Sequence, residues 1–232
     1  MSRSGLAGLR WTAALFDLDG TLVDSRLGIL AALSSAFHEV TGGDADLGAV
    51  DLSLPLAAMV RSVVPAADDT RIERLEAAFR RHYDAGDWRL GSPYPGASRC
   101  LASLCDAYVR VFVVTNKRTS IALKVLEHHQ LARWVLAVYG QSDSSRAVAK
   151  SSLARQCILE QGLEPSRTVV VGDSDHDAAV AADMGMHLLA ATYGVGPLAP
   201  SASGAGRIDV GSLTEAAAKI LESEPGGGEC ES

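Results

Sequence analysis

Short apolar runs alternate with helical patterns along most of the chain. Runs in which nearly every residue is apolar indicate buried parallel strands, and they lie at 12–16, 109–114, 135–139, 168–171 and 187–191, with a weaker one at 208–210. Between them, the segments 97–106, 119–130, 152–161 and 176–184 have helical composition. Strands that alternate with helices of this length predict right-handed βαβ units around a mostly parallel sheet.

One interval, residues 24–93, breaks this alternation. It has no convincing strand and instead contains helical stretches at 27–41, 54–64 and 68–84. The last of these places apolar residues among arginines and glutamates with the spacing of an amphipathic surface helix. We therefore expect an α/β protein, with a Rossmann-like core over 1–22 and 94–222 and an inserted α-helical cap domain over 23–93. The glycine-rich end, 223–232, is expected to be disordered.

Composition and charge narrow the classes of function. The chain has 232 residues, of which 47% are hydrophobic and 21% charged, and its net charge is −7. The sequence has neither the basic stripe of a nucleic-acid partner nor a polybasic membrane segment. The first apolar run is too short for a signal peptide or a membrane span, and the four cysteines form no C-x-x-C pair. We expect a cytoplasmic protein with reduced thiols, either a monomer or a homodimer.

Polar side chains gather where the expected strands end. Ligands of open parallel sheets bind beyond the carboxyl ends of the strands, so these side chains should converge on one edge of the sheet. They are Asp17 and Asp19 after the first strand, Thr115 and Asn116 after the second, Asp173 after the fourth, and Lys150 before the helix that leads to that fourth strand.

Several carboxylates in one partly buried place repel each other, and their pKa values separate unless a cation is present. A divalent metal resolves this conflict, and an all-oxygen ligand set suits Mg²⁺. A neighbouring lysine would hold the remaining charge of a phosphoryl group. The residue types therefore indicate a magnesium and phosphate site.

Four segments resemble, in order and spacing, the four motifs of the haloacid dehalogenase-like superfamily. They are "DLDGT" (17–21), "TN" (115–116), Lys150 and "GDSDHD" (172–177). The longer segments "LFDLDGTLVDS", "YPG", "VVTNK" and "VVVGDSDHDAAVAADMGM" are similar to the phosphoglycolate phosphatase-like branch, which carries a helical cap after the first strand. The resemblance covers residues 11–195 or so, and four ordered motifs are far more specific than one D-x-D.

This resemblance implies roles for the acids. Asp17 would be the nucleophile that forms an aspartyl-phosphate, and Asp19 would be the general acid/base. Mg²⁺ would be held by Asp17, by the backbone carbonyl of Asp19 and by Asp173. The strand should break at 18–19 to free that carbonyl.

The resemblance also implies a phosphate-binding set. Thr115 would hold the phosphoryl group and Lys150 would neutralise its charge, with Asn116 beside them. The backbone amides of Gly20 and Thr21 would lie near the phosphate oxygens. Asp177 would support Lys150 or the waters of the metal from the second layer of contacts.

The expected function is Mg²⁺-dependent hydrolysis of a small phosphate monoester, with phosphoglycolate as the first substrate. Alternative substrates are pyrophosphate and a nucleoside monophosphate. Alternative functions are a non-catalytic phosphate-binding protein on the same scaffold and, third in order, a transferase or mutase. Asp19 argues against dehalogenase and phosphonate-cleaving relatives, which lack the second acid. Ile29 stands where mutase relatives have a histidine.

Other polar residues have two interpretations each. Imidazole suits Mg²⁺ poorly, so His176 is expected on a helix surface. The group 80–83 (Arg-Arg-His-Tyr) could clamp a substrate anion, but we expect a solvated face. Lys117 could guard the site or begin a helix, and Asp24 is expected to cap the first helix of the insert rather than to act in catalysis.

Overall fold

The computed structural model describes residues 10–48, 50–52, 54–143, 147–196, 198 and 206–222. The end segment 223–232, which we expected to be disordered, lies outside these residues. Within them, one sheet of six parallel strands has the order β5-β4-β1-β6-β7-β8. The strands are β1 (Ala13–Phe16), β4 (Arg110–Arg118), β5 (Ala137–Gln141), β6 (Thr168–Gly172), β7 (His187–Ala191) and β8 (Arg207–Val210).

β1 lies in the middle of the sheet. It pairs with β4 on one side and with β6 on the other, so that Phe16 stands beside both Val113 and Val171. Because all pairings are parallel, the ends of β4, β1 and β6 meet at one edge. The residues that follow these three strands are therefore brought together.

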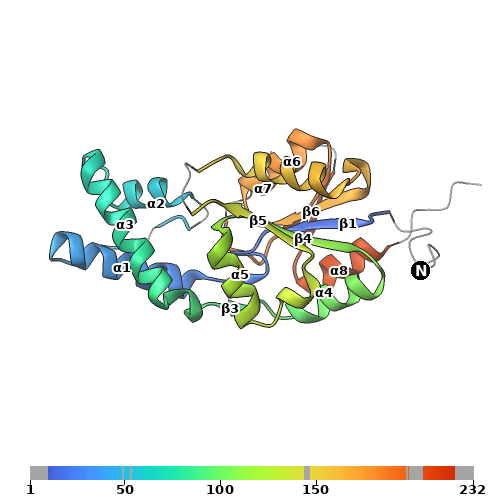
Figure 1. Ribbon diagram of the computed structural model, residues 1–232, viewed down its shortest axis with the longest axis horizontal. Helices are drawn as coiled ribbons and strands as arrows, with labels where there is room; N and C mark the ends of the chain where they lie inside the picture. Colours follow the sequence, from blue (N-terminus) through green and yellow to red (C-terminus); the bar gives the residue numbers. More distant parts are fainter. Residues whose placement is uncertain are drawn as a thin grey trace, which may run out of the picture.

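Helices cover both faces of the sheet (Figure 1). One face packs against α4 (Ala97–Asp106), α5 (Thr119–His128) and α8 (Leu213–Leu221), and the other against α6 (Lys150–Gln161) and α7 (Asp175–Met184). Side chains of β1 alternate between the two cores: Ala14 and Phe16 enter one, Ala13 and Leu15 the other. Burial on both faces explains why the strands read as continuous apolar runs, and the predicted α/β fold is confirmed.

A group of helices stands beyond the carboxyl ends of the strands (Figure 1). We call it the helical lobe; it comprises α1 (Arg26–Thr41), α2 (Leu56–Val63), α3 (Asp69–Ala85) and the 3₁₀ turn η2 (Asp87–Leu90). Leu33 and Phe37 of α1 and Ile72 and Leu75 of α3 are buried in one cluster. The Asp68 side chain accepts from the backbone N–H of Arg71 at 2.8 Å and caps α3.

The two connections between the lobe and the sheet lie side by side. β2 (Val23–Asp24) pairs antiparallel with β3 (Ser92–Pro93), and Val23 stands opposite Pro93. No strand was expected here, because two residues are too few to show an alternating pattern. The short ribbon fixes the point from which the lobe extends.

α8 was not among the expected helices. The Gly, Ala and Ser residues after 200 look like a tail, yet Leu213, Ala216, Ala217 and Ile220 repeat at helical spacing and are buried. A segment of small residues can therefore form a helix with a buried apolar face, although its composition resembles that of a linker.

Two further 3₁₀ turns, η3 (Ala132–Trp134) and η4 (Pro165–Arg167), lead into β5 and β6.

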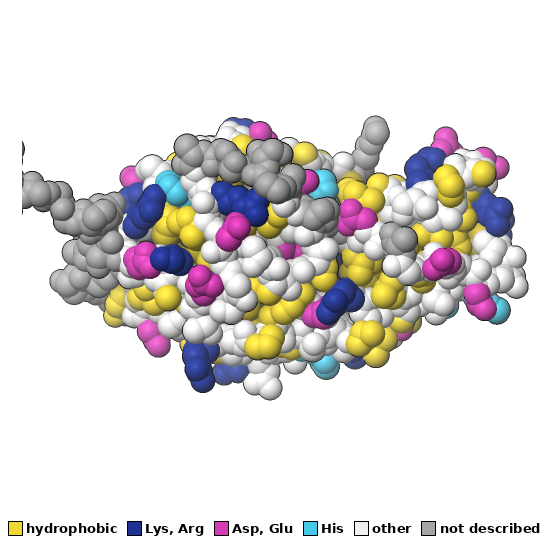
Figure 2. All heavy atoms as spheres, turned by 180° about the vertical axis from the view of Figure 1, so that it is seen from behind, with side chains coloured by type: hydrophobic (Ala, Val, Ile, Leu, Met, Phe, Trp, Pro, Cys, Tyr) yellow, Lys and Arg dark blue, Asp and Glu magenta, His cyan; other side chains and the backbone are white. Residues whose placement is uncertain are grey.

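Acidic and basic side chains are interspersed over the face shown in Figure 2. In the part of the chain that the structure describes, none of the helices has both the length and the apolar character needed to cross a bilayer. The described cysteines, Cys100, Cys105 and Cys157, are unpaired thiols, as expected; Cys230 lies outside the described residues.

Candidate active site

Asp17 stands directly after the central strand. β1 ends at Phe16, and the backbone N–H of Asp17 still donates to the carbonyl of Val171 on β6, with N···O 2.9 Å. The chain leaves the sheet slightly before the break expected at 18–19. Gly20 makes the following turn at φ 86°, and a Cβ there would lie 2.2 Å from Asp173 Oδ2. Only glycine lets this turn pass so close to a second carboxylate.

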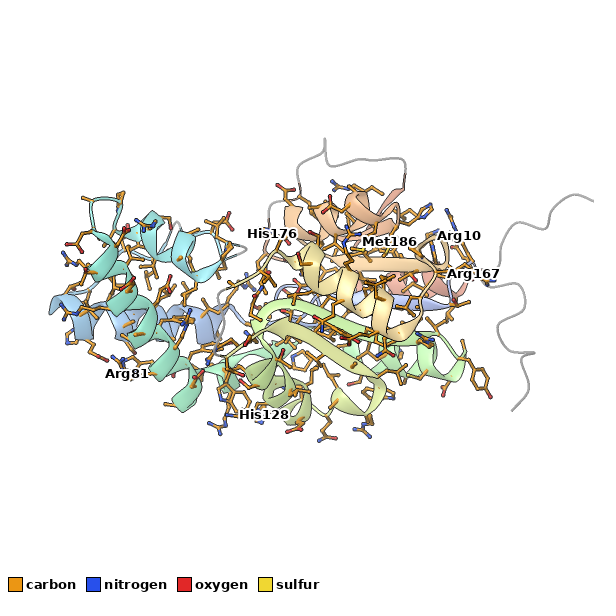
Figure 3. All side chains as sticks on the ribbon, turned by 45° about the horizontal axis from the view of Figure 1, so that its top comes forward. Arg10, Arg81, His128, Arg167, His176 and Met186 are labelled. Carbon is orange, nitrogen blue, oxygen red and sulfur yellow. The ribbon has the colours of Figure 1, made fainter. Side chains whose placement is uncertain are left out.

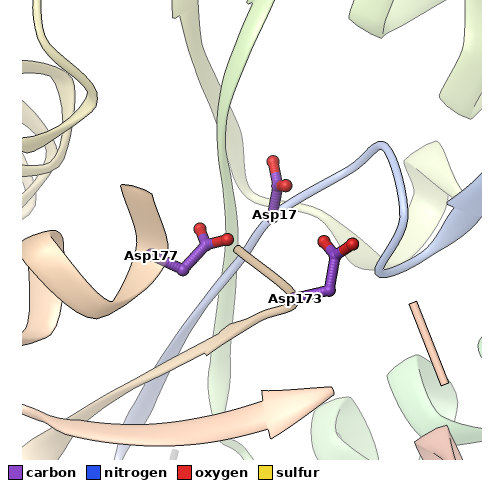
Figure 4. Close-up of side chains that lie close together, drawn as sticks. All are labelled: Asp17, Asp173 and Asp177. Carbon is purple, nitrogen blue, oxygen red and sulfur yellow. The ribbon is translucent and has the colours of Figure 1, made fainter. Parts of the chain in front are cut away.

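Three buried carboxylates meet at this edge of the sheet. Asp17 comes from the loop after β1, Asp173 from the end of β6 and Asp177 from the first turn of α7, and they converge on one space (Figure 4). One oxygen of each lies within 4.8 Å of the others. The grouping of Asp17 with Asp173 and Asp177 agrees with the expected site, and it draws on segments more than 150 residues apart.

Lys150 is the ion-pair partner of two of these acids. Its Nζ lies 2.7 Å from Asp17 Oδ1 and 2.6 Å from Asp177 Oδ1, and its side chain is 4% exposed. Lys150 is the first residue of α6, where the helix begins at the edge of the sheet. The contact with Asp177 places that acid where it supports Lys150, as expected.

Both carboxylate oxygens of Asp177 have partners within the protein. Oδ1 meets Lys150, while Oδ2 accepts from the backbone N–H of Ser174 at 3.1 Å and from its hydroxyl at 2.7 Å. Ser174 and Asp177 form the capping box of α7. These contacts fix Asp177 beside Lys150 and hold the ammonium group in place.

Asp173 is held by neutral donors. Its Oδ1 accepts from the Thr21 hydroxyl at 3.0 Å, and its Oδ2 accepts from the backbone N–H groups of Val195 and Gly196, each at 2.9 Å. The loop 194–196 was not expected in the site, and its signal in the sequence is the glycine alternation in "YGVG". These donors orient Asp173 without adding a positive charge.

The charge balance of the site is negative. Burial, together with the charges of Asp177 and Asp173, raises the pKa of Asp17 to about 8, although Lys150 opposes this. Burial also raises the pKa of Asp173. Burial would lower the pKa of Lys150, but its pairing with Asp17 and Asp177 outweighs burial and raises it. One lysine cannot neutralise three buried carboxylates, so the site can accept the positive charge of a divalent cation. The carboxylate oxygens are ligands that fit Mg²⁺.

Asp19 points into a different set of contacts. Its Oδ2 lies 2.8 Å from Lys117 Nζ, and its Oδ1 accepts from the Ser25 hydroxyl. Lys117 in turn contacts the hydroxyl of Tyr83 at 2.9 Å. Lys117 therefore belongs to the site, and its role as a helix start is wrong because β4 continues to Arg118. Ser25 was not expected in the site.

Thr115 lies near the end of β4 and is buried, and Asn116 beside it is half-buried. The Thr115 hydroxyl accepts from the backbone N–H of Lys117 at 3.2 Å. The backbone amides of Gly20 and Thr21 donate inside their own turn, to Val23 and Leu18, at 2.8 and 3.4 Å. The expectation that these two amides serve phosphate is therefore corrected: Thr21 contributes its hydroxyl to Asp173 instead.

The four residues 80–83 do not share one environment. Arg80 pairs with Glu76, while Arg81 and His82 pair with Glu39, all on the exposed surface of the lobe, and Figure 3 shows Arg81 on α3 of the helical lobe. The expected solvated face is correct for these three residues. It is wrong for Tyr83, which is buried against the core.

Two other polar residues lie near the starts of helices. His176 is half-buried in the first turn of α7, at the end that faces the lobe (Figure 3). The cap expected at Asp24 is corrected: the N-cap of α1 is Ser25, while Asp24 ends β2 and its carboxylate accepts from the backbone N–H of Arg26 at 3.1 Å and pairs with the Arg26 guanidinium at 2.6 Å.

A pocket of about 540 Å³ lies beside the loop Gly194–Gly196, whose backbone binds Asp173. Its walls are the loop 50–52 and Arg26 from the lobe side and the loop Gly194–Gly196 from the core. Since Gly196 also binds Asp173, the pocket adjoins the carboxylate cluster. A small molecule in it would touch both parts of the protein.

The fold, the ordered motifs and the carboxylate cluster point to one protein family, and comparison with known proteins agrees. The sequence profile of the haloacid dehalogenase-like hydrolases matches residues 14–191. The chain belongs to this family, and its relatives place it in the phosphoglycolate phosphatase-like branch.

Individual relatives illustrate the range of the family. The plasmid phosphoglycolate phosphatase of Cupriavidus necator is 32% identical over 201 residues, which cover 84% of this chain and 87% of that protein. Tyrosine-protein kinase PtkA of Mycobacterium tuberculosis is 28% identical over 184 residues, which cover 78% of this chain but only 62% of the length of PtkA. A haloacid dehalogenase-like hydrolase structure from Streptococcus pneumoniae, 26% identical, matches with a TM-score of 0.79 over 90% of this chain and 98% of that one.

Proposed function

We propose that this protein is a Mg²⁺-dependent phosphatase that hydrolyses a small phosphate monoester through a phosphorylated Asp17. The observation that carries the proposal is the position of Asp17, buried at the carboxyl end of the central strand, paired with Lys150 and close to Asp173. A binding protein needs no carboxylate held in this way for attack on phosphorus. This arrangement supports covalent catalysis.

The chain's own residues supply most of the chemistry. The Asp17 carboxylate would attack phosphorus while the bond to the leaving oxygen breaks, and Asp19 would give that oxygen a proton. In the second half, Asp19 would take a proton from water as the water attacks phosphorus; the bond from phosphorus to Asp17 breaks, which releases phosphate and restores the Asp17 carboxylate. Lys150 and the Thr115 hydroxyl would hold the phosphoryl oxygens, and Asn116 would line their side of the site.

Asp17, Asp173 and the backbone carbonyl of Asp19 would hold Mg²⁺, with Asp177 fixing Lys150 beside them. When bound, the cation supplies positive charge that keeps Asp17 ionised and offsets the charge of the phosphoryl oxygens. The charge balance supports this role, because three buried carboxylates share one lysine.

Phosphoglycolate is the proposed substrate. Relatives named phosphoglycolate phosphatase, at 32% and 31% identity, support it. In this proposal the helical lobe, over residues 23–93, is a cap that excludes bulk water. We further propose that the protein is a cytoplasmic monomer or homodimer and that its substrate is a small phosphorylated metabolite.

Other phosphate chemistries use the same residues. A relative named 5'-nucleotidase, 26% identical, supports a nucleoside monophosphate, and pyrophosphate is a further alternative. Relatives named tyrosine-protein kinase support a third alternative, the transfer of a phosphoryl group to a tyrosine. These alternatives differ in leaving group or acceptor, not in the use of Asp17.

Steady-state assays test the proposal. The wild type should release phosphate from an aryl phosphate only with Mg²⁺, and Asp17→Asn should abolish the release. Asp175→Asn is the matched control, since Asp175 lies in the same motif but on the exposed surface, and it should retain activity. A panel of phosphoglycolate, nucleoside monophosphates and pyrophosphate then ranks substrates by kcat/KM. Release that continues without Mg²⁺, or in Asp17→Asn, would contradict the proposal.

A further inference from the structure

Two adjacent contacts join the lobe to the end of β4. Tyr83 and Asp84, consecutive residues of α3, meet Lys117 and Arg118, consecutive residues of β4. Lys117 Nζ lies 2.9 Å from the Tyr83 hydroxyl and 4.7 Å from the centre of its ring. Arg118 pairs with Asp84 and also reaches Asp143 at 3.3 Å. These contacts form a clasp with two arms.

Only one arm of the clasp reaches the active site. Lys117 Nζ also lies 2.8 Å from Asp19 Oδ2, and its side chain is 8% exposed. The other oxygen of Asp19 accepts from Ser25. Both oxygens of Asp19 are therefore held from the side that faces the lobe, and the ammonium group that holds Oδ2 is itself held by Tyr83. The Arg118–Asp84 arm contacts the same two elements but does not touch Asp19.

We propose that Lys117 and Tyr83 are positioning residues for Asp19, so that docking of α3 on β4 sets the direction of the Asp19 carboxyl group. The proposal rests on the proposed function, in which Asp19 serves the leaving oxygen. The carboxyl group of Asp19 must lie within hydrogen-bond distance of that oxygen. Without Lys117, Oδ2 loses its partner and the side chain gains rotational freedom.

The step that depends on this position is the departure of the leaving group. A bond forms between Asp17 and phosphorus, the bond from phosphorus to the leaving oxygen breaks, and the electron pair stays on that oxygen, which takes a proton from Asp19. An alkoxide needs this proton, whereas a nitrophenolate is stable enough to leave without it. A displaced Asp19 should therefore slow alkyl phosphates more than aryl phosphates.

The test compares leaving groups in three variants. For Lys117→Met, kcat/KM should fall about 100-fold for an alkyl phosphate such as phosphoglycolate and about 3-fold for p-nitrophenyl phosphate. Tyr83→Phe keeps the buried ring and removes the hydroxyl, so it should show a smaller effect of the same kind. Asp84→Asn breaks the other arm of the clasp, and it should change both substrates by the same factor.

The outcomes separate this proposal from the proposed function. Loss of p-nitrophenyl phosphate turnover in Asp17→Asn, with Mg²⁺-dependent turnover in the wild type, tests the phosphatase alone. Equal factors for both substrates in Lys117→Met would overturn the positioning role, and so would a leaving-group effect in Asp84→Asn as large as that in Lys117→Met. If Lys117→Met does not fold, Tyr83→Phe decides in the same way, since equal factors there also overturn the role.

Discussion

Replacing Lys150 by methionine removes the ammonium group that pairs with both Asp17 and Asp177. Both carboxylates are buried, with Asp177 1% exposed, and each lies within 2.7 Å of Lys150 Nζ. Methionine keeps the length and most of the volume of the side chain. The variant therefore isolates the loss of charge from the loss of packing.

The structure sets the size of the effect. Breaking a buried ion pair by removing one partner costs about 3–5 kcal/mol, because the other charge is left uncompensated. The pKa of Asp17 is already raised to about 8, so this group can take up a proton and soften the loss. We therefore expect a cost near the lower end, about 3 kcal/mol, which lowers Tm by about 6–12 °C in a chain of this size.

Thermal denaturation at pH 7 with a chelator measures this cost. Lys124→Met, at an exposed lysine of α5, is the matched control and should leave Tm unchanged. Adding Asp177→Asn to Lys150→Met should recover part of the loss, because it removes one uncompensated carboxylate. If Lys150→Met melts at the same temperature as Lys124→Met, the electrostatic account of the site is refuted.

Two further predictions concern the metal and the glycines. Mg²⁺ at about 100 times its Kd should stabilise the protein by about 2.7 kcal/mol, seen as a rise of about 5–11 °C in Tm; Asp173→Asn should lose this shift while Asp175→Asn keeps it, and an unchanged shift in Asp173→Asn would contradict the assignment. In Gly194→Ala, the new Cβ would lie 2.3 Å from Asp173 Cβ and 2.5 Å from the Gly20 carbonyl, so kcat/KM should fall about 100-fold through displacement of Asp173. Gly43→Ala, where a Cβ meets nothing within 4 Å, should have wild-type activity, and equal activity of the two variants would refute the packing argument.

The fold was largely readable from the sequence, because buried parallel strands and amphipathic helices leave strong patterns. β7 has the bounds that the apolar run 187–191 indicates, and α4 matches 97–106. The ribbon of β2 and β3 was missed because two-residue strands have no period. α8 was missed because the Gly, Ala and Ser residues before it look like a tail, although Leu213, Ala216, Ala217 and Ile220 recur at helical spacing and pack against α4.

The residues of the candidate site that belong to sequence motifs could be predicted. Those that reach the site only through tertiary contacts between distant segments could not. Asp17, Asp173, Asp177 and Lys150 come together as expected. Tyr83 stands in a run of charged residues, and its burial depends on how α3 docks on the core.

Other members of the site left weaker signals. The contact of Lys117 with Tyr83 spans 34 positions, and no local pattern encodes it. The amides of Gly20 and Thr21 were misjudged because the hydrogen bonds of a tight turn are not visible in a motif.

Trapping the intermediate tests the central claim most directly. The enzyme is mixed with Mg²⁺ and an aryl phosphate, quenched in acid within the first turnover, and digested for mass spectrometry. A phosphate adduct on Asp17, absent from Asp17→Asn and present in Asp175→Asn, is the predicted result. Full turnover by the wild type with no adduct, or with the adduct on another residue such as Asp19, would contradict the account.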